Sequence, residues 1–468
     1  MKDEKQMKSN PQRREGGAGF QPSTLRLPPS YVTTALALVT AFVLGGIIIW
    51  ITSGKFETVL RAYDGLVRGA FFKQRGLSES LVATVPYILL SLAVAVGFKT
   101  GLFNIGAEGQ FYIGAISAAW AGQAFHGLPA IIHLPLSLAV GALGGAIWAG
   151  IPGYLKARTG AHEVISTMMM NYVAFRFAEF GVSVPLRDKL ATAVQTPRVA
   201  PEAELWTFAD VPARLQDPLN ALGAALVIAF VAWAIAREIA NARRQKIKDE
   251  KPKAAASFVG RHSALIIALA AGVVTFVGLP ALSRVWWPFP DPYDRLHIGL
   301  LMALLAAVGV WWLLWKTTLG FEMRTVGANP SAARYAGVSI TRNIMLAMSI
   351  SGALAGLGGT VEVLGVSICR CLPLFFSSGY GFDSIAIALL ANNNPFGIVA
   401  ASFLFGAMRN GADLMELNSG VSKYVISVIQ ALLLLFAAAP PIIRWLYRIK
   451  AERRVEEEAV AMRGWGGG

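Results

Sequence analysis

The chain has 468 residues, of which 55% are hydrophobic and 15% are charged. A soluble domain usually carries about 25% charged residues, so this composition excludes an ordinary soluble protein. The formal net charge is +14, but the basic residues lie in loops and tails between apolar runs. That placement is typical of a membrane protein rather than of a nucleic-acid-binding protein. We therefore expect membrane lipid, and no nucleic acid, among its partners.

Apolar runs long enough to cross a bilayer recur along the chain, since about 20 residues suffice for a helix. We predict an all-α polytopic membrane protein with about twelve transmembrane helices. They are expected roughly at 31–52, 80–98, 103–124, 131–154, 164–184, 219–236, 263–284, 297–316, 343–365, 381–394, 396–414 and 421–445.

The basic residues predict how these helices are oriented. With a cytoplasmic N-terminus, the predicted inner segments carry about twice as many Lys and Arg residues as the outer ones, in line with the positive-inside bias of membrane proteins. We therefore expect cytoplasmic tails at 1–30 and 448–468, and a transmembrane domain at 31–447.

The stretch GLFNIGAEGQFYIGA places Asn104, Glu108 and Gln110 at membrane depth among glycines. A charge in the bilayer centre costs about 3 kcal/mol or more, so Glu108 must face protein, water or a partner. On a continuous helix, Asn104 and Glu108 would share a face. Two interpretations stay open: a broken helix that lines a substrate path, or a hydrogen-bonded clamp between helices.

The remaining charges in the predicted spans are interpreted as local pairs. Arg176 and Glu179 are three residues apart, and a second set lies on one helical face at Arg409, Asp413 and Glu416. Glu362 and Asp383 lie near the predicted outer ends of their spans. They either form the mouth of a path or are solvated.

The loop TTLGFEMRTVGANPSAARYAGVSITRN contains a short predicted helix, NPSAARYAG. Asn329 is expected to cap it, Pro330 to occupy its first position and Gly337 to end it. A short basic helix of this kind lies on the membrane surface or docks on a soluble partner.

Motifs for catalysis and nucleotide binding are missing. The chain has no GxxxxGK[ST], HExxH or GxSxG sequence, so we expect no catalytic residue, cofactor or metal site. Cys369 and Cys371 lack the spacing of a zinc site. They fall in a predicted outer segment where oxidation is possible, and we favour their interpretation as two small apolar residues.

Four segments together resemble the nucleoside and simple-sugar ABC importer permeases, relatives of the ribose and branched-chain amino acid permeases. They are GLFNIGAEGQFYIGA, LKARTGAHEVISTMMMNYVA, GFEMRTVGANPSAARYAGVSITR and GYGFDSIAIALLANNNPFGIVAASFLFGA. The resemblance covers 80–184 and 297–440. It implies a type II-like importer core of about ten helices, with a substrate path between two permease subunits. We assign the path to Asn104, Glu108, Gln110, Asn171 and Asp383.

The resemblance also implies partners and a coupling segment. In the family, the loop that matches 317–342 contacts a separate ATPase, which binds ATP and magnesium, and we carry this role to Gly327, Asn329, Ala332, Ala333 and Gly337. A sister permease, giving a heterodimer, and an extracytoplasmic substrate-binding lipoprotein are also implied. This chain departs from the family at 219–284, where a helix pair with a basic cytoplasmic loop is inserted, and at Ala391–Asn392, where many relatives have Gly-Arg.

The function implied is therefore that of a non-catalytic permease subunit in the inner membrane of a bacterium, with nucleosides as the expected substrates. Simple sugars such as ribose are the alternative. A secondary transporter that uses Glu108 and Asp383 as ion sites is a second alternative, and a membrane-embedded enzyme is disfavoured because no site pattern is present.

Overall fold

The computed structural model describes residues 29–125, 127–249, 258–285, 288–289 and 291–448. Within these residues the chain is helical, and its only extended pairings are two isolated bridges. The all-α prediction is confirmed. Most of the predicted tails 1–30 and 448–468, and part of the basic loop within 219–284, lie outside the described residues.

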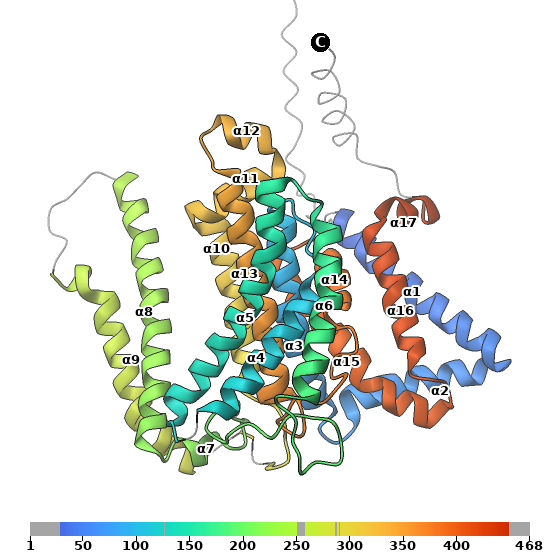
Figure 1. The fold of residues 1–468 in the computed structure, drawn as a ribbon, viewed down its shortest axis with the longest axis horizontal. Coiled ribbons are helices and arrows are strands. Elements are labelled where there is room, and N and C mark those ends of the chain that lie inside the picture. Colours follow the sequence, from blue (N-terminus) through green and yellow to red (C-terminus); the bar gives the residue numbers. More distant parts are fainter. Residues whose placement is uncertain (1–28, 126, 250–257, 286–287, 290, 449–468) are drawn as a thin grey trace, which may run out of the picture.

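The helices follow one another along the chain as Figure 1 shows, with longer connections between α6 and α7, between α9 and α10 and between η2 and α14. In order they are α1 (Pro29–Ser53), α2 (Phe56–Val67), η1 (Arg68–Phe72), α3 (Gly76–Lys99), α4 (Ala107–Ala124), α5 (Ala130–Thr159), α6 (Glu163–Ser183), α7 (Val211–Arg214), α8 (Pro218–Asp249), α9 (Phe258–Val285), α10 (Gly299–Lys316), α11 (Thr318–Ala328), α12 (Pro330–Tyr335), α13 (Ile340–Val361), η2 (Glu362–Val366), α14 (Tyr380–Leu390), α15 (Pro395–Ser419), α16 (Tyr424–Ala438) and α17 (Pro440–Leu446).

Each predicted span falls on a helix, but the count of about twelve is not confirmed by length and composition. In the described part of the chain, seven helices are long and apolar enough to cross a membrane. An eighth candidate is the pair α16 and α17, which meet at 91°. Helices α4, α6 and α15 carry polar residues that lower their hydropathy, and α14 has only 11 residues.

Small residues bring the central helices into backbone contact. A Cβ atom added at Gly356 would lie 2.4 Å from the Gly141 carbonyl oxygen, and one added at Gly145 would lie 2.2 Å from the Gly352 carbonyl oxygen. Helices α5 and α13 therefore touch along their glycines, because only small residues allow this approach. Helix α3 lies at the centre of the bundle, and most of its residues, including the whole run from Thr84 to Gly97, are buried.

The helix α2 was not predicted, although the sequence carries a signal for it. Val59, Ala62 and Leu66 are buried at a spacing of three and four residues, which is the pattern of an amphipathic helix. Figure 1 shows α2 lying across the bundle rather than along it. Gly65 lies close to the backbone of Met415, so that α2 packs against α15.

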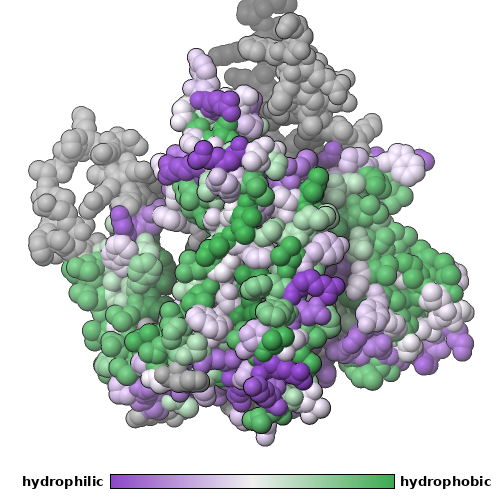
Figure 2. All heavy atoms as spheres, in the orientation of Figure 1, coloured by the Kyte–Doolittle hydropathy of each residue, from purple (hydrophilic) through white to green (hydrophobic). Residues whose placement is uncertain are grey.

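Helices α8 and α9 pair at one edge of the bundle, over the residues of the predicted insertion (Figure 1). Their surface is largely hydrophobic in Figure 2. An apolar cavity of about 530 Å³ separates their lower ends from α5 and α10. The two ends of the bundle also differ: α11, α12 and α17 lie at one end, and α7 lies at the other (Figure 1).

Candidate substrate path and coupling segment

The chain is not helical between α3 and α4, from Thr100 to Gly106. The predicted helix 103–124 therefore begins only at Ala107, and the expectation that Asn104 shares a helical face with Glu108 is wrong. Asn104 and Gln110 are six positions apart, yet their amides exchange two hydrogen bonds of 3.0 Å. The nitrogen of Asn104 also donates to Ser351 on α13 at 2.9 Å. These bonds fix the broken segment inside the bundle.

Asn171 on α6 holds the same segment from another side. Its side-chain nitrogen donates to the Ile105 carbonyl at 3.0 Å, and its oxygen accepts from the Gly109 backbone N–H at 2.8 Å. Both polar atoms of its side chain thus bond to backbone groups around the start of α4. Asn171 therefore connects α6 to the helix break. Its side chain supplies hydrogen-bond partners for the Ile105 carbonyl and the Gly109 N–H, backbone groups that a continuous helix would pair internally.

Glu108 lies in the first turn of α4 and is 2% exposed. One carboxylate oxygen accepts from the Ser377 hydroxyl and the other from the Gly381 backbone N–H, each at 2.5 Å. A carboxylate in the first turn of a helix is also favoured by the helix dipole. A Cβ atom at Gly381 would lie 2.5 Å from the Glu108 nitrogen. The absence of a side chain at Gly381 therefore permits the two hydrogen bonds of the Glu108 carboxylate to Ser377 and Gly381, which we call the Glu108 latch.

Asp383 belongs to a separate polar group that crosses three helices. It accepts a 2.9 Å hydrogen bond from the Tyr87 hydroxyl of α3. Arg409 of α15 donates to the same hydroxyl at 3.1 Å and also to Ser378, and its guanidinium lies 4.1 Å from the ring centre of Tyr380. Arg409 is thus stabilised by hydrogen bonds and a cation–π contact.

The predicted pairing of Arg409 with Asp413 and Glu416 is therefore wrong. Asp413 lies 3.5 Å from the Lys423 ammonium, and Glu416 accepts from the Lys423 backbone N–H at 3.4 Å. The tertiary contacts of Arg409 prevail over its helical neighbours. By contrast, the predicted pair Arg176–Glu179 is confirmed, with 2.5 Å between its charged atoms.

Glu362 is also buried, which excludes its interpretation as a solvated residue. It begins η2, and its Oε2 atom has no hydrogen-bond partner among the described residues. Asp383 is partly buried. Of the predicted path residues, Asn104, Glu108, Gln110 and Asn171 come together around the start of α4, whereas Asp383 joins the group on α3 and α15.

The predicted short helix is present as α12, and its local signals are confirmed. The Asn329 side chain accepts from the backbone N–H groups of Ser331 and Ala332, at 3.0 and 3.1 Å. Pro330 opens the helix, and Gly337 follows it with a φ of +80°. Ala333 is buried against the bundle and Ala332 is exposed, so α12 presents one face outward.

Gly327, at the end of α11, has a different environment from the rest of the predicted coupling residues. A Cβ atom there would lie 2.5 Å from the Lys99 carbonyl oxygen and 2.8 Å from the Gly101 nitrogen. The position therefore requires glycine for close approach. It joins α11 to the beginning of the helix break that contains Asn104.

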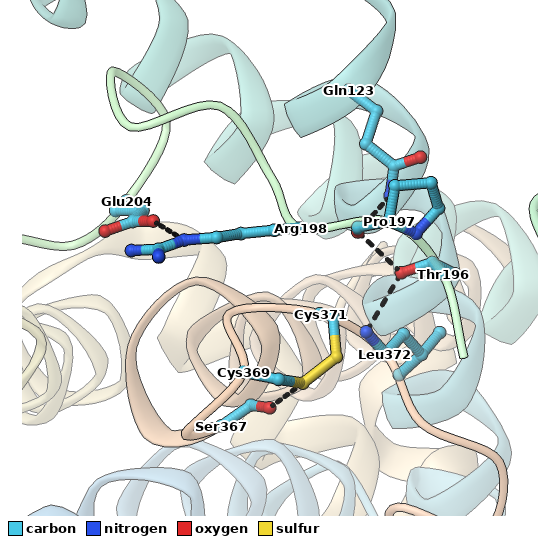
Figure 3. Close-up of a disulfide and its surroundings, with 9 residues drawn as sticks. All are labelled: Gln123, Thr196, Pro197, Arg198, Glu204, Ser367, Cys369, Cys371 and Leu372. Atoms are coloured by element: carbon cyan, nitrogen blue, oxygen red, sulfur yellow. Dashed lines mark hydrogen bonds and ion pairs between the residues drawn. A yellow bond between two sulfur atoms is a disulfide. The ribbon is translucent and has the colours of Figure 1, made fainter. Parts of the chain in front are cut away.

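Cys369 and Cys371 form a disulfide, shown in Figure 3. Their interpretation as two small apolar residues is therefore wrong. The bond lies in the segment between η2 and α14, and the next residue, Leu372, exchanges hydrogen bonds of 3.0 Å with Thr196. The disulfide thus supports the contact between this segment and the chain between α6 and α7. In the described ranges, no group of three or more His, Cys, Asp or Glu residues is arranged to hold a metal ion.

Residues 76–438 match the family described as branched-chain amino acid transport system / permease component. The chain belongs to this family. Its predicted resemblance is confirmed, and the protein is a multi-pass membrane permease of the ABC transporter class, a transport subunit. No solved structure matches the fold of this chain.

Named relatives align along most of the chain. It is 35% identical to the guanosine ABC transporter permease protein NupP of Bacillus subtilis, over 89% of this chain and 96% of that protein. It is 29% identical to the nucleoside ABC transporter permease protein NupB of Lactococcus lactis, over 92% and 96%. It is 30% identical to the glucose ABC transporter permease protein TsgB13 of Haloferax volcanii, over 87% of each chain.

Proposed function

We propose that this chain forms the path for nucleosides in an ATP-driven ABC importer. The observation that carries the proposal is the 35% identity to a guanosine permease over 89% of the chain. Simple sugars are the second candidate, because a glucose permease is 30% identical over 87% of the chain.

The proposed path passes the start of α4, where Asn104, Glu108, Gln110 and Asn171 lie. A non-helical segment at membrane depth is tolerated where protein buries it or where it lines a cavity. Here its polar groups are paired and buried, which fits a closed path. Opening would require the Glu108 latch to part from Ser377 and Gly381, while Asp383 and Tyr87 hold α14 to α3.

A separate ATPase subunit would supply the energy by binding ATP and magnesium, and would dock on α11 and α12. The capped helix α12, with Asn329 before it and Gly337 after it, projects from the bundle (Figure 1). Tyr335 is 97% exposed at its tip. A rigid, projecting helix can transmit a push from a partner, whereas a flexible loop would absorb it.

The proposed ATPase contact at α12 also gives the orientation of the chain in the membrane. If α12 meets an ATPase, then the end of the bundle that holds α11, α12 and α17 (Figure 1) faces the cytoplasmic side of the bacterial inner membrane. The tails predicted to be cytoplasmic would extend from that side. The opposite end, with α7 and the disulfide-bearing segment, would receive substrate from an extracytoplasmic binding lipoprotein. The sister permease would complete a heterodimer around the path.

The test is uptake of labelled guanosine by the native cells, with the gene of this chain deleted or restored. ATP is held high while an uncoupler collapses the proton gradient, and unlabelled ribose, glucose and leucine serve as competitors. We expect uptake that requires this chain, resists the uncoupler and ignores the competitors. Loss of uptake on uncoupling would favour an ion-coupled transporter, and competition by ribose or glucose would favour the sugar alternative.

A further inference from the structure

A cavity of about 180 Å³ lies beside the Glu108 latch, between α4, α6 and the segment 372–376. Its lining includes Tyr112, Phe175 and Phe376. The ring centre of Tyr112 lies 4.6 Å from that of Phe376 and 4.8 Å from that of Phe175. These separations are typical of aromatic packing, so the three rings form one wall. A pocket for a complete small ligand is usually about 300–1,000 Å³, and this cavity therefore suits part of one.

Two charged residues mark the side from which the cavity is reached. Arg176 and Glu179 of α6 belong to its lining, and their side chains are 81% and 38% exposed. Charged side chains in a membrane helix face a protein interior or a water-filled cavity rather than lipid. Figure 2 shows hydrophilic residues over α6 within an otherwise hydrophobic band. This face of α6 therefore borders water or the partner permease.

Phe375 adds a strained aromatic residue at the rim. Its φ is +57°, in the left-handed region that is unfavourable for residues other than glycine, and the residue is 75% exposed. A bulky residue in this conformation is uncommon, and such strain is concentrated at ligand-binding sites and switches. The disulfide Cys369–Cys371 restrains the chain a few residues earlier.

The cavity is connected to the latch at membrane depth. Tyr112 lies one helical turn beyond Glu108 on α4, and Phe376 directly precedes Ser377, which donates to the Glu108 carboxylate. A planar group that displaced Phe376 would therefore move the hydroxyl that holds Glu108. Ligand occupancy and the opening of the latch are thus linked through two adjacent residues.

We propose that this cavity is a subsite for the nucleobase of the transported nucleoside. The inference rests on the proposed function. Bases stack on aromatic side chains, and the Arg176–Glu179 pair offers donors and acceptors for the edge of a purine. A sugar would need many hydrogen-bonding partners, whereas the lining of the cavity is otherwise aromatic or apolar. The ribose would remain outside, toward the path.

The test is the KM of uptake in deletion cells that produce variant chains, with guanosine and uridine as labelled substrates. Phe376→Leu keeps an apolar side chain but removes the ring, and Phe376→Tyr restores a ring. The control is Phe396→Leu, which removes an exposed ring on α15 outside the cavity. Glu179→Gln removes the carboxylate at the rim without altering the wall.

We expect Phe376→Leu to raise the KM at least about fivefold, the lower end of what loss of one stacking contact costs, with Phe376→Tyr near wild type. Glu179→Gln should raise the guanosine KM more than the uridine KM. Free guanine should inhibit the wild type and not Phe376→Leu. Unchanged KM values in Phe376→Leu and Glu179→Gln, in cells that take up guanosine through the wild type, would overturn the subsite alone. Absence of wild-type uptake would overturn the proposed function with it.

Discussion

Gly327 and Gly101 touch backbone to backbone, so that a Cβ atom built on Gly101 would lie 3.0 Å from the Gly327 Cα atom. Gly327 is the penultimate residue of α11, and Gly101 is the second residue of the non-helical segment that carries Asn104 and leads to Glu108. The two glycines thus join the proposed ATPase-contacting end to the helix break without an intervening side chain. Movement of α11 would be passed directly to the segment that holds the latch.

Replacement of Gly327 by valine should disrupt this junction. The new side chain would press on the Lys99 carbonyl and the Gly101 nitrogen, which are backbone atoms that cannot yield as a flexible side chain can. Overpacking of this kind costs about 1–3 kcal/mol, and uptake should fall several-fold. Gly309→Val is the control, because nothing lies within 4 Å of a Cβ atom there. Equal uptake by both variants would contradict the coupling role of the junction.

Replacement of Gly337 by leucine tests the coupling helix itself. Gly337 has a φ of +80° and open space around it, so the substitution costs backbone strain of about 1–2 kcal/mol without a clash. We expect the membrane fold to persist while uptake falls and less ATPase co-purifies. Gly420→Leu imposes the same strain at a φ of +68°, again without near neighbours, after α15. If the two variants behave alike, the ATPase does not dock at α12.

Local sequence patterns predicted the structure well where local interactions determine it. Asn329, Pro330 and Gly337 define α12 through caps within a few residues, and the apolar runs match the helices because bilayer thickness fixes their length. The predictions from sequence were wrong where contacts between distant residues determine the structure. Arg409 meets Tyr87, which is 322 positions away, instead of its helical neighbours. The helix break at Thr100 to Gly106 depends on Asn171 and Ser351, which no pattern near Asn104 reveals.

The path residues illustrate the same limit. Glycine and amide residues among apolar ones indicated an unusual segment, but its partners on α6, α13 and α14 come from the tertiary fold. The disulfide was open to prediction from two cysteines in an outer segment. Spacing alone, however, does not distinguish a bond from two free thiols. The amphipathic helix α2 could have been predicted from the helical spacing of its apolar residues.

Substitution of Glu108 distinguishes a structural latch from an ion site. Glutamine can still accept from the Gly381 N–H and donate to the Ser377 oxygen, whereas alanine removes both hydrogen bonds. Hydrogen bonds to charged groups are worth about 1.5–3 kcal/mol. We expect Glu108→Ala to lose thermal stability and uptake, and Glu108→Gln to retain most of both. Loss of uptake in a stable Glu108→Gln protein would support ion coupling at this carboxylate.

Reduction of the disulfide Cys369–Cys371 should loosen the segment before α14. A cross-link that closes so short a loop contributes about 1–2 kcal/mol, and the same segment contains Ser377, which donates a hydrogen bond to Glu108. A membrane-impermeant reductant should lower uptake by the wild type. The Cys369→Ser/Cys371→Ser variant should show the lowered uptake already and should not respond further. A response of that variant to reductant would place the sensitive disulfide elsewhere in the transporter.

Acid should weaken the junction between α3 and the segment before α10. Arg75 donates to Asp291 at 2.5 Å, and this hydrogen bond holds the pKa of the Asp291 carboxyl below its ordinary value. A depressed pKa contributes stability that is complete above the pKa of the unfolded chain and is lost as the pH falls through the folded value. The Tm of the detergent-solubilised protein should therefore be lower in Asp291→Asn than in the wild type at neutral pH. The difference should begin to shrink below about pH 4, the ordinary range of an aspartate. It should vanish only below the lowered pKa of Asp291 in the folded protein, where both side chains are uncharged. A Tm difference that stays constant from neutral pH into acid would show that the charge of Asp291 does not stabilise this junction.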